Sequence, residues 1–488
     1  MLIKQSKNSY IRIYDDGEMA YIANQLTRHD RTYTDSGVAF LQQITRYPKN
    51  VEEIVNSLAR IYDCEEETLR NDFIEFANDL AHHKFVLVGK SLEELEEQEL
   101  DFSYELDNPK TLIEDFSQIT NENVDNNTQD FLLQHDREHP RLAALQFEVS
   151  SRCNERCIHC YIPNEKKNSG FDLTFDRFKY ILDQFATMGG IHVTLSGGEA
   201  LLNKDITRML RYCREKDMEI SLLTNLISLN DEHIKILKEV NVSIIQVSLY
   251  SMNPAVHDTI TTVKGSWLRT IDAIEKLHSA DVPVQISCPV MKANKEGYDE
   301  VMKYAQSLKM KSNTDYIMMA QADLDTTNLA NRLSIKETEK VIRDILSFDI
   351  DYKEQTLNGD PISSIPTEEY SEMPLCGAGI NDLCITVNGD VYPCAGWQSY
   401  VVGNVFHQPL KEIWCNSPKL AEIRKVRQKD FPKCLTCEAR DYCAMCLVRN
   451  YNESGGNMFK INQHFCDVAF LNKRLAEEWK AKYQQLNI

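Results

Sequence analysis

The segment LAALQFEVSSRCNERCIHC, residues 142–160, places three cysteines in a short loop directly behind an apolar stretch. These are Cys153, Cys157 and Cys160, and their spacing supplies three thiolates to one tight turn. Three thiolates are one short of the four that close an iron–sulfur or zinc site. A [4Fe–4S] cube held by this loop would keep one iron free for an exogenous ligand. The spacing therefore predicts a cluster with an open iron.

Around this loop, short apolar runs alternate with amphipathic helix patterns such as Thr174–Met188, whose phenylalanines share one face. Repeated strand–helix units predict parallel strands with right-handed crossovers, and six units favour a partial (β/α)6 TIM barrel in an α/β fold. Catalytic loops of such folds follow the C-terminal ends of strands, as the cysteine loop does. The expected strands are Leu142–Val149, His192–Leu195, Glu219–Thr224, Val242–Tyr250, Val282–Val290 and Asp315–Met319.

A second motif, Ser196-Gly-Gly-Glu199, follows the second expected strand. Two glycines let the backbone approach a ligand closely, and a carboxylate there can accept a hydrogen bond from an ammonium group. Together with the cysteine loop, this motif resembles the radical S-adenosylmethionine superfamily, in which an aromatic residue such as His159 precedes the third cysteine. The resemblance implies that the open iron binds S-adenosylmethionine and that Gly197, Gly198 and Glu199 contact its methionine part.

Ser248 is a further candidate for cofactor binding. Alternation along the fourth strand puts Gln246, Ser248 and Tyr250 on one face, and polar residues on a central barrel strand indicate a lumen. The family resemblance places Ser248 at the ribose, and a hydrogen-bonded core serine is the alternative. The sequence identifies no catalytic side chain.

Nine of the fifteen cysteines lie between residues 376 and 466. Zinc ribbons separate their CxxC pairs by about 15–20 residues, whereas only five residues separate the pairs here. The pattern resembles the SPASM domain of radical peptide- and protein-modifying enzymes, except that its last close pair has two intervening residues where that family more often has three. The resemblance implies two auxiliary [4Fe–4S] clusters, a distal one on Cys434, Cys437, Cys443 and Cys466, and a nearer one on Cys376, Cys394 and Cys446.

Cys384 is the open question in this region. As a fourth ligand it would close the nearer cluster; as a residue of an expected strand, Leu383–Val387, it would leave one iron open. Cys415 lies in a helical pattern and is expected to be structural. The isolated cysteines are expected to be small core residues; they are Cys64, Cys213 and Cys288.

Residues 1–90 show strand patterns followed by three helix patterns, an order that resembles a winged helix-turn-helix domain. DNA binding is disfavoured, because this segment carries 11 Lys and Arg against 14 Asp and Glu. The order of elements instead resembles the chaperone of the PQQ precursor peptide. That family implies that a precursor's leader adds a strand to the third strand and lies against the last helix, a common mode of peptide recognition.

The expected domains are residues 1–90 for leader recognition, 91–140 as an acidic linker, 141–345 as the radical S-adenosylmethionine barrel, and 346–488 as the SPASM domain with a C-terminal helix. The net charge of −20 disfavours nucleic acid as a partner. No apolar run is long enough for a membrane span, and the N-terminus has no apolar signal core. These features predict a cytoplasmic protein.

The combined resemblances imply an enzyme with S-adenosylmethionine and three [4Fe–4S] clusters. A 5′-deoxyadenosyl radical would abstract hydrogen from a ribosomally made precursor peptide, with an intramolecular thioether from cysteine sulfur to carbon as the first-ranked product. Alternatives are carbon–carbon cross-linking, epimerisation and an anaerobic sulfatase-type maturase, which would not need residues 1–90. Rivals of other classes are an iron–sulfur redox-sensing regulator and a zinc-rich scaffold. The expected electron donor is a flavodoxin- or ferredoxin-type protein.

Overall fold

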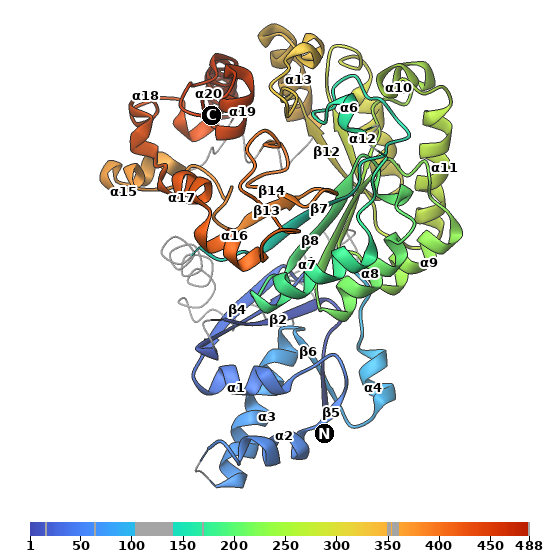
Figure 1. Cartoon of the computed structure of the whole chain (residues 1–488), viewed down its shortest axis with the longest axis vertical. Helices are drawn as coiled ribbons and strands as arrows, with labels where there is room; N and C mark the ends of the chain where they lie inside the picture. Colours follow the sequence, from blue (N-terminus) through green and yellow to red (C-terminus); the bar gives the residue numbers. More distant parts are fainter. Residues whose placement is uncertain are drawn as a thin grey trace.

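The computed structural model describes residues 1–14, 17–62, 65–102, 140–167, 170–348, 353 and 361–486. Within these, six parallel strands lie side by side in sequence order at the centre of the molecule (Figure 1). This confirms the expected partial barrel. The strands are β7 (Ala144–Ser150), β8 (His192–Gly197), β9 (Glu219–Thr224), β10 (Ile244–Ser248), β11 (Gln285–Pro289) and β12 (Lys311–Asp315).

The central strands are apolar because helices cover their outer face. Leu145, Phe147 and Val149 of β7 are fully buried, with Phe147 against Phe178 of the first crossover helix. Such burial is typical of parallel sheets with crossover helices. The helices are α7 (Phe175–Thr187), α8 (Ile206–Glu215), α9 (Asp231–Glu239), α10 (Pro254–Thr261), α11 (Ser266–Ser279), α12 (Tyr298–Ser307) and α13 (Ile335–Phe348).

The sixth strand was misplaced by the sequence pattern. The prediction put it at Asp315–Met319, but β12 is Lys311–Asp315 and residues 317–319 lie in the loop that follows. β12 pairs only with β11 among the described strands and is largely exposed. An edge strand needs no apolar face, so its sequence, KSNTD, lacks the pattern that marks the others.

The C-terminal domain extends the barrel sheet. β13 (Asp382–Ile385) pairs in parallel with β7, so that Asp382 lies opposite Ala144 and Cys384 opposite Gln146. Leu383 and Ile385 join the same hydrophobic core as Phe147, which fixes the cysteine-rich domain to the barrel. The remaining elements are β14 (Asp390–Tyr392), β15 (Gly403–Asn404), α15 (Thr367–Ser371), α16 (Leu410–Asn416), α17 (Pro418–Lys425), α18 (Pro432–Leu435), α19 (Leu447–Ser454) and α20 (Gln463–Leu486).

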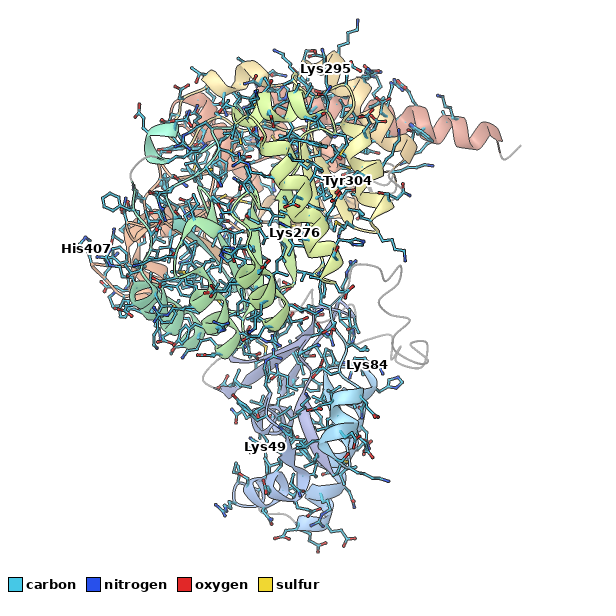
Figure 2. The ribbon with its side chains drawn as sticks, turned by 90° about the vertical axis from the view of Figure 1, so that its right-hand side faces the viewer. Lys49, Lys84, Lys276, Lys295, Tyr304 and His407 are labelled. Carbon is cyan, nitrogen blue, oxygen red and sulfur yellow. The ribbon has the colours of Figure 1, made fainter. Side chains whose placement is uncertain are left out.

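The N-terminal domain has its own core, and Figure 2 shows it below the rest of the molecule, with Lys49 and Lys84 labelled. Three antiparallel strands, β2 (Ser9–Tyr14), β3 (Met19–Asn24) and β4 (His29–Thr34), form one sheet in that order. Among the described residues, the outer edge of β4 pairs with no strand. The other elements are β1 (Leu2–Gln5), α1 (Ser36–Gln43), β5 (Lys49–Asn50), α2 (Val51–Leu58), α3 (Glu66–His82) and β6 (Val86–Gly89).

The first part of the expected linker packs on this domain. Ser91 caps α4 (Leu92–Glu97), Leu95 is buried, and Glu99 accepts hydrogen bonds from Ser6 and Lys7. Residues 103–139, the rest of that linker except Pro140, lie outside the described residues, as does Cys64. None of the described helices combines the length and the hydropathy needed to cross a bilayer.

Asp217 fastens the N-terminal domain to the barrel. It stands after α8 at a φ of 56° and accepts hydrogen bonds from Arg46 and from Gln5, the latter at 3.0 Å. Arg12 forms an ion pair with the same carboxylate and donates to the Asp217 and Gly190 carbonyls. Burial alone would raise the pKa of Asp217, but Arg46 and Arg12 outweigh it and lower the pKa.

We expect Asp217→Asn to lower the free energy of unfolding by about 3 kcal/mol, because it leaves the buried Arg12 and the half-buried Arg46 without their anion. A lowered carboxyl pKa contributes stability above its ordinary value and loses it as the pH falls through the folded-state pKa, so the variant should lose less stability on acidification. Denaturant unfolding at neutral and acidic pH measures both effects. Asp281→Asn is the matched control, with the same backbone conformation (φ 55°) and a 91% exposed side chain; an equal loss in both variants would contradict the account.

Candidate functional site

The three-cysteine loop lies at the C-terminal end of β7 and is fixed on both sides. The backbone N–H groups of Arg156 and Ile158 donate to the carbonyls of Thr261 and Ile260, each at 3.0 Å. The hydroxyl of Tyr250 lies 3.7 Å from the Cys157 sulfur. Burial raises the pKa of Cys157 well above its ordinary value, and Glu155 and Cys160 add to the rise. The loop therefore holds the three thiols close together. Iron bound there would favour their ionised, thiolate form.

The two glycines of the second motif are required by the cysteine loop itself. A Cβ on Gly197, whose φ is +136°, would lie 2.4 Å from the Ser150 carbonyl oxygen. A Cβ on Gly198 would lie 2.4 Å from the Arg152 oxygen and 3.1 Å from the Cβ of Cys153. Only glycine permits this approach of the two loops. The motif therefore shapes the cluster loop as well as the space beside it.

Glu199 is buried and already holds three donors. Its Oε1 accepts from the Thr224 hydroxyl at 2.6 Å and the Leu201 N–H at 2.9 Å, while Oε2 accepts from the Asn225 N–H at 2.8 Å. Burial raises its pKa, and these hydrogen bonds act against the rise. Since each carboxylate oxygen offers two lone pairs, one acceptor position remains on Oε2 for a ligand ammonium. The contact between this motif and S-adenosylmethionine remains a prediction. Within the motif, the free position on Oε2 of Glu199 and the backbone groups are what could make it.

Thr224 and Asn225 are site residues that the sequence reasoning missed. The available signal was a polar pair at the end of an apolar parallel strand, β9, where ligand-binding loops of such sheets lie. Asn225 also donates from its side chain to Asn154, inside the cysteine loop, at 2.6 Å. These contacts join the first and second motifs through the third strand.

Thr224→Val should weaken S-adenosylmethionine binding about tenfold or more, because a buried carboxylate loses a hydroxyl donor. Thr224→Ser, which keeps the hydroxyl, should bind as the parent does. Equilibrium binding of labelled S-adenosylmethionine to the reconstituted proteins measures the difference. Equal affinities for the valine and serine variants would show that the hydroxyl has no such role.

A cavity of about 250 Å³ lies between the two motifs and is lined by Cys153, Cys157, Cys160, Gly197, Gly198 and Glu199. Gln246, Ser248 and Tyr250 line its opposite wall, as strand alternation predicts. The donor set and the space therefore suit a three-thiolate cluster with a ligand on its open iron. The role of Ser248 at the ribose remains a prediction.

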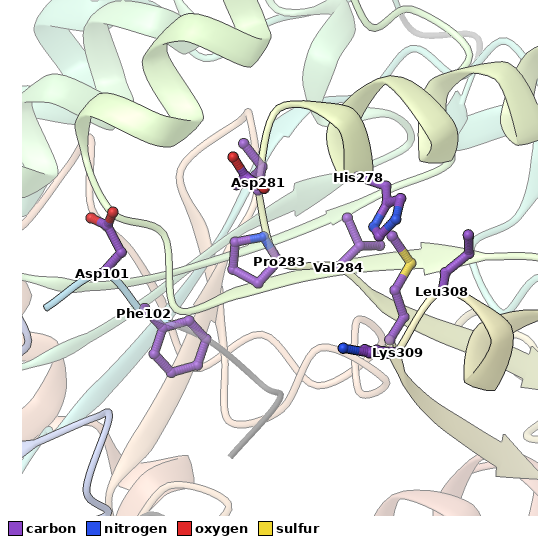
Figure 3. Close-up of a pocket in the computed structure, with 10 residues that line it drawn as sticks. Asp101, Phe102, His278, Asp281, Pro283, Val284, Leu308 and Lys309 are labelled. Carbon is purple, nitrogen blue, oxygen red and sulfur yellow. The ribbon is translucent and has the colours of Figure 1, made fainter. Parts of the chain in front are cut away.

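A second cavity, of about 190 Å³, adjoins the first through Ile162 and Gly198. It lies between β7 and the β13–β14 hairpin, with Glu148 and Gln398 in its wall. Gln398 donates to Glu148, whose pKa burial raises to about 7, while Lys166 and Gln398 act in the opposite direction. The cavity next to Asp101 and Phe102 in Figure 3 is different, because it precedes β11 and β12 at the N-terminal ends of the strands and is lined by no cysteine.

The C-terminal cysteines gather in two groups. Cys434, Cys437, Cys443 and Cys466 interact electrostatically with one another, and burial together with these neighbours raises the pKa of Cys443 to about 11. Cys376, Cys394 and Cys446 interact in the same way, and burial is the main reason that the pKa of Cys394 rises to about 12. These are the two sets that the sequence assigned to the distal and nearer clusters. Their ligand roles remain predictions.

The other described cysteines lie outside these groups, except Cys384, which neighbours one of them. Cys213 and Cys288 are buried, in α8 and β11, and Cys415 is exposed on α16. Cys384 is fully buried in β13 and has Cys394 among its neighbours. In the described part of the chain, no three Cys, His, Asp or Glu side chains converge closely enough to hold a single metal ion.

Three family models match separate parts of the chain. The radical SAM superfamily matches residues 147–305, an iron–sulfur cluster-binding domain called SPASM matches residues 376–438, and the coenzyme PQQ synthesis protein D, PqqD, matches residues 31–86. The three matches agree with the barrel, the cysteine-rich domain and the N-terminal domain.

Similar proteins have more than one activity. An AdoMet-dependent heme synthase of Methanosarcina barkeri is 27% identical over 65% of this chain and 93% of its own length. The antilisterial bacteriocin subtilosin biosynthesis protein AlbA of Bacillus subtilis is 26% identical over 65% of this chain and 70% of its own.

Solved structures share the fold. SuiB of Streptococcus suis bound to its precursor peptide SuiA has a TM-score of 0.60 and 17% identity, covering 91% of this chain and 96% of SuiB. The enzyme anSMEcpe bound to AdoMet and the Cp18Cys peptide has a TM-score of 0.54 and 16% identity, over 72% of this chain and 100% of its own. The SuiB match spans the N-terminal, barrel and C-terminal parts together.

Proposed function

We propose that this chain, a radical S-adenosylmethionine enzyme with SPASM and PqqD domains, modifies a ribosomally made precursor peptide. Its cofactors are S-adenosylmethionine, a [4Fe–4S] cluster that binds it, and auxiliary clusters. The observation that carries the proposal is the PqqD domain, whose outer strand β4 has a free edge in the described structure and which is fastened to the barrel through Asp217. AlbA and SuiB, which resemble the chain, support a peptide substrate.

The cofactors supply one kind of chemistry: when bound, they generate a 5′-deoxyadenosyl radical that takes a hydrogen atom, and the auxiliary clusters accept an electron. The protein's own work is to position one C–H bond and to exclude water. The cavity beside Glu148 and Gln398 suits this task, since it adjoins the cofactor cavity and is lined on its other side by residues of the turn after β13 and of β14. We assign this cavity to the modified residue of the peptide.

The first-ranked product is a thioether between a cysteine sulfur and a carbon of the same peptide. In that reaction the carbon would lose a hydrogen atom and the thiol a proton as the C–S bond forms, and an auxiliary cluster, when bound, would accept the remaining electron. The family resemblance motivates this ranking above carbon–carbon cross-linking and epimerisation, and no residue of the chain determines it. A flavodoxin- or ferredoxin-type protein is the proposed electron donor for the first cluster.

Porphyrin chemistry is the second candidate, because a heme synthase is among the similar proteins. The N-terminal domain favours the peptide. A leader bound at β4 would raise the local concentration of the core peptide at the barrel, so that weak contacts around the cavity suffice.

The test is to incubate the reconstituted enzyme and S-adenosylmethionine with the precursor peptide encoded next to it. A product lighter by two hydrogens, with one cysteine no longer alkylated by iodoacetamide, supports a thioether. The same mass loss with all cysteines still alkylated supports a carbon–carbon link. A product whose mass is unchanged in ordinary water but rises by one deuterium in heavy water supports epimerisation, and a peptide that stays unmodified overturns the proposal.

A further inference from the structure

Asp382 stands at the start of β13, beside the nearer cysteine group. The chain reverses direction after Cys376, in a turn where the N–H groups of Ile380 and Asn381 donate to the Gly377 carbonyl at 2.8 and 3.1 Å. Ala378 and Asp382 then form an isolated bridge. The turn therefore carries the Asp382 carboxylate back toward the Cys376 thiol.

One oxygen of this carboxylate lacks a protein partner. Its Oδ1 is buried and accepts no hydrogen bond from the residues that the structure describes. Burial raises its pKa to about 6, and the only opposing contribution comes from its own backbone N–H. An unsatisfied buried acceptor costs about 1–3 kcal/mol, so such a group requires an explanation.

The neighbours of Asp382 are thiols. Burial raises the pKa of Cys376 to about 11, and both Cys446 and Asp382 add to that rise. Burial likewise raises the pKa of Cys394, and its charged neighbours are Asp382, Cys446 and Cys376. The carboxylate thus belongs to the same group of side chains as the three cysteines of the nearer cluster.

Cys384 fits that group less well. It lies two residues along the same strand and so shares its face with Asp382, but its charged neighbours are Glu148, Cys394 and Asp382. Cys376 and Cys446 are not among them. Of the two candidates, Asp382 interacts electrostatically with more of the group, and of the two only Asp382 carries a buried oxygen without a partner.

We infer that Asp382 is the fourth protein ligand of the nearer auxiliary cluster, completing a set formed with Cys376, Cys394 and Cys446. Binding requires the ionised carboxylate, and iron then satisfies its buried oxygen. Cys384 remains a packed thiol of the core. A carboxylate is a harder ligand than a thiolate, which makes this iron chemically distinct from the other three. This ligand set does not depend on which bond the enzyme forms in the peptide. It can therefore be tested separately from the proposed function.

The test uses the full-length reconstituted enzyme with saturating S-adenosylmethionine, which occupies the open iron of the first cluster. Isotopically labelled imidazole is added, and pulsed electron paramagnetic resonance of the reduced protein detects imidazole nitrogen bound to a cluster. Asp382→Ala should open one iron and show this coupling, whereas the parent and the matched Cys384→Ala variant should not. Iron content and circular dichroism identify a variant that has lost its clusters or fold.

A second measurement covers the case in which Asp382→Ala loses the cluster. Asp382→Cys should retain the parent iron content, and Asp382→Asn should raise the midpoint potential of one auxiliary cluster, because the net charge at that cluster becomes less negative. Coupling in Cys384→Ala but not in Asp382→Ala would overturn the inference in favour of Cys384. Coupling in the parent protein, or potentials that are unchanged in Asp382→Asn, would also overturn it.

Discussion

Cys157→Ala should reduce reductive cleavage of S-adenosylmethionine by about a thousandfold or more, to the background of the assay. Cys157 is the central cysteine of the loop, its sulfur is the one that Tyr250 contacts, and Cys160 is among its charged neighbours. No other cysteine lines the cofactor cavity besides Cys153 and Cys160, so no thiolate can replace it there. The cluster that holds the cofactor should therefore be lost rather than altered.

Release of 5′-deoxyadenosine under dithionite, together with iron and sulfide content, measures this effect. The variant should lose about four irons per chain and keep those of the auxiliary clusters, because the C-terminal cysteines belong to separate groups. Cys415→Ala is the control, since Cys415 is exposed on α16 and outside every group. Full cleavage activity in Cys157→Ala would falsify the assignment of the first cluster to this loop.

The parts of this architecture that were predictable from sequence depend on local patterns. Parallel strands covered by crossover helices carry apolar residues on the covered face, so β7 to β11 stand out, and cluster ligands recur at short, characteristic spacings. β12 was missed for the converse reason, because an edge strand carries no such constraint. The expected division of the cysteines into two ligand sets came from family resemblance, and it remains a prediction.

The residues that sequence reasoning missed act through contacts between distant segments. Asp217 meets Arg12 and Arg46 across 205 and 171 positions of the chain, and Thr224 meets Glu199 only because β8 and β9 are adjacent. Asp382 is an ordinary strand-initial aspartate until the turn after Cys376 brings it near the thiols of Cys376 and Cys394. Such roles have no periodicity or spacing, so they become visible only once the fold is known.

The second large effect is expected at the surface formed by β4 and α3, where the proposed leader would bind. Phe76 of α3 packs edge-to-face on Tyr33 of β4, with ring centroids 5.2 Å apart, and Arg31 of β4 forms an ion pair with Asp79 at 2.7 Å. A peptide strand added to the edge of β4 would lie over these side chains. Phe76→Glu places a charge at the apolar centre of that surface, and changes at such a centre have the largest effects on binding.

Phe76→Glu should therefore weaken binding of the precursor peptide about a hundredfold and reduce its modification at low peptide concentration to a similar extent. Cleavage of S-adenosylmethionine without peptide should be unchanged, because the N-terminal domain has a core separate from that of the barrel. Asn78→Glu is the control: it adds the same charge at an exposed position on the opposite side of α3. Fluorescence anisotropy of the labelled leader and product yield at limiting peptide measure the two effects, and thermal unfolding shows that the domain remains folded. If both variants bind the leader as the parent does, recognition occurs elsewhere, and the PqqD domain has another task in this enzyme.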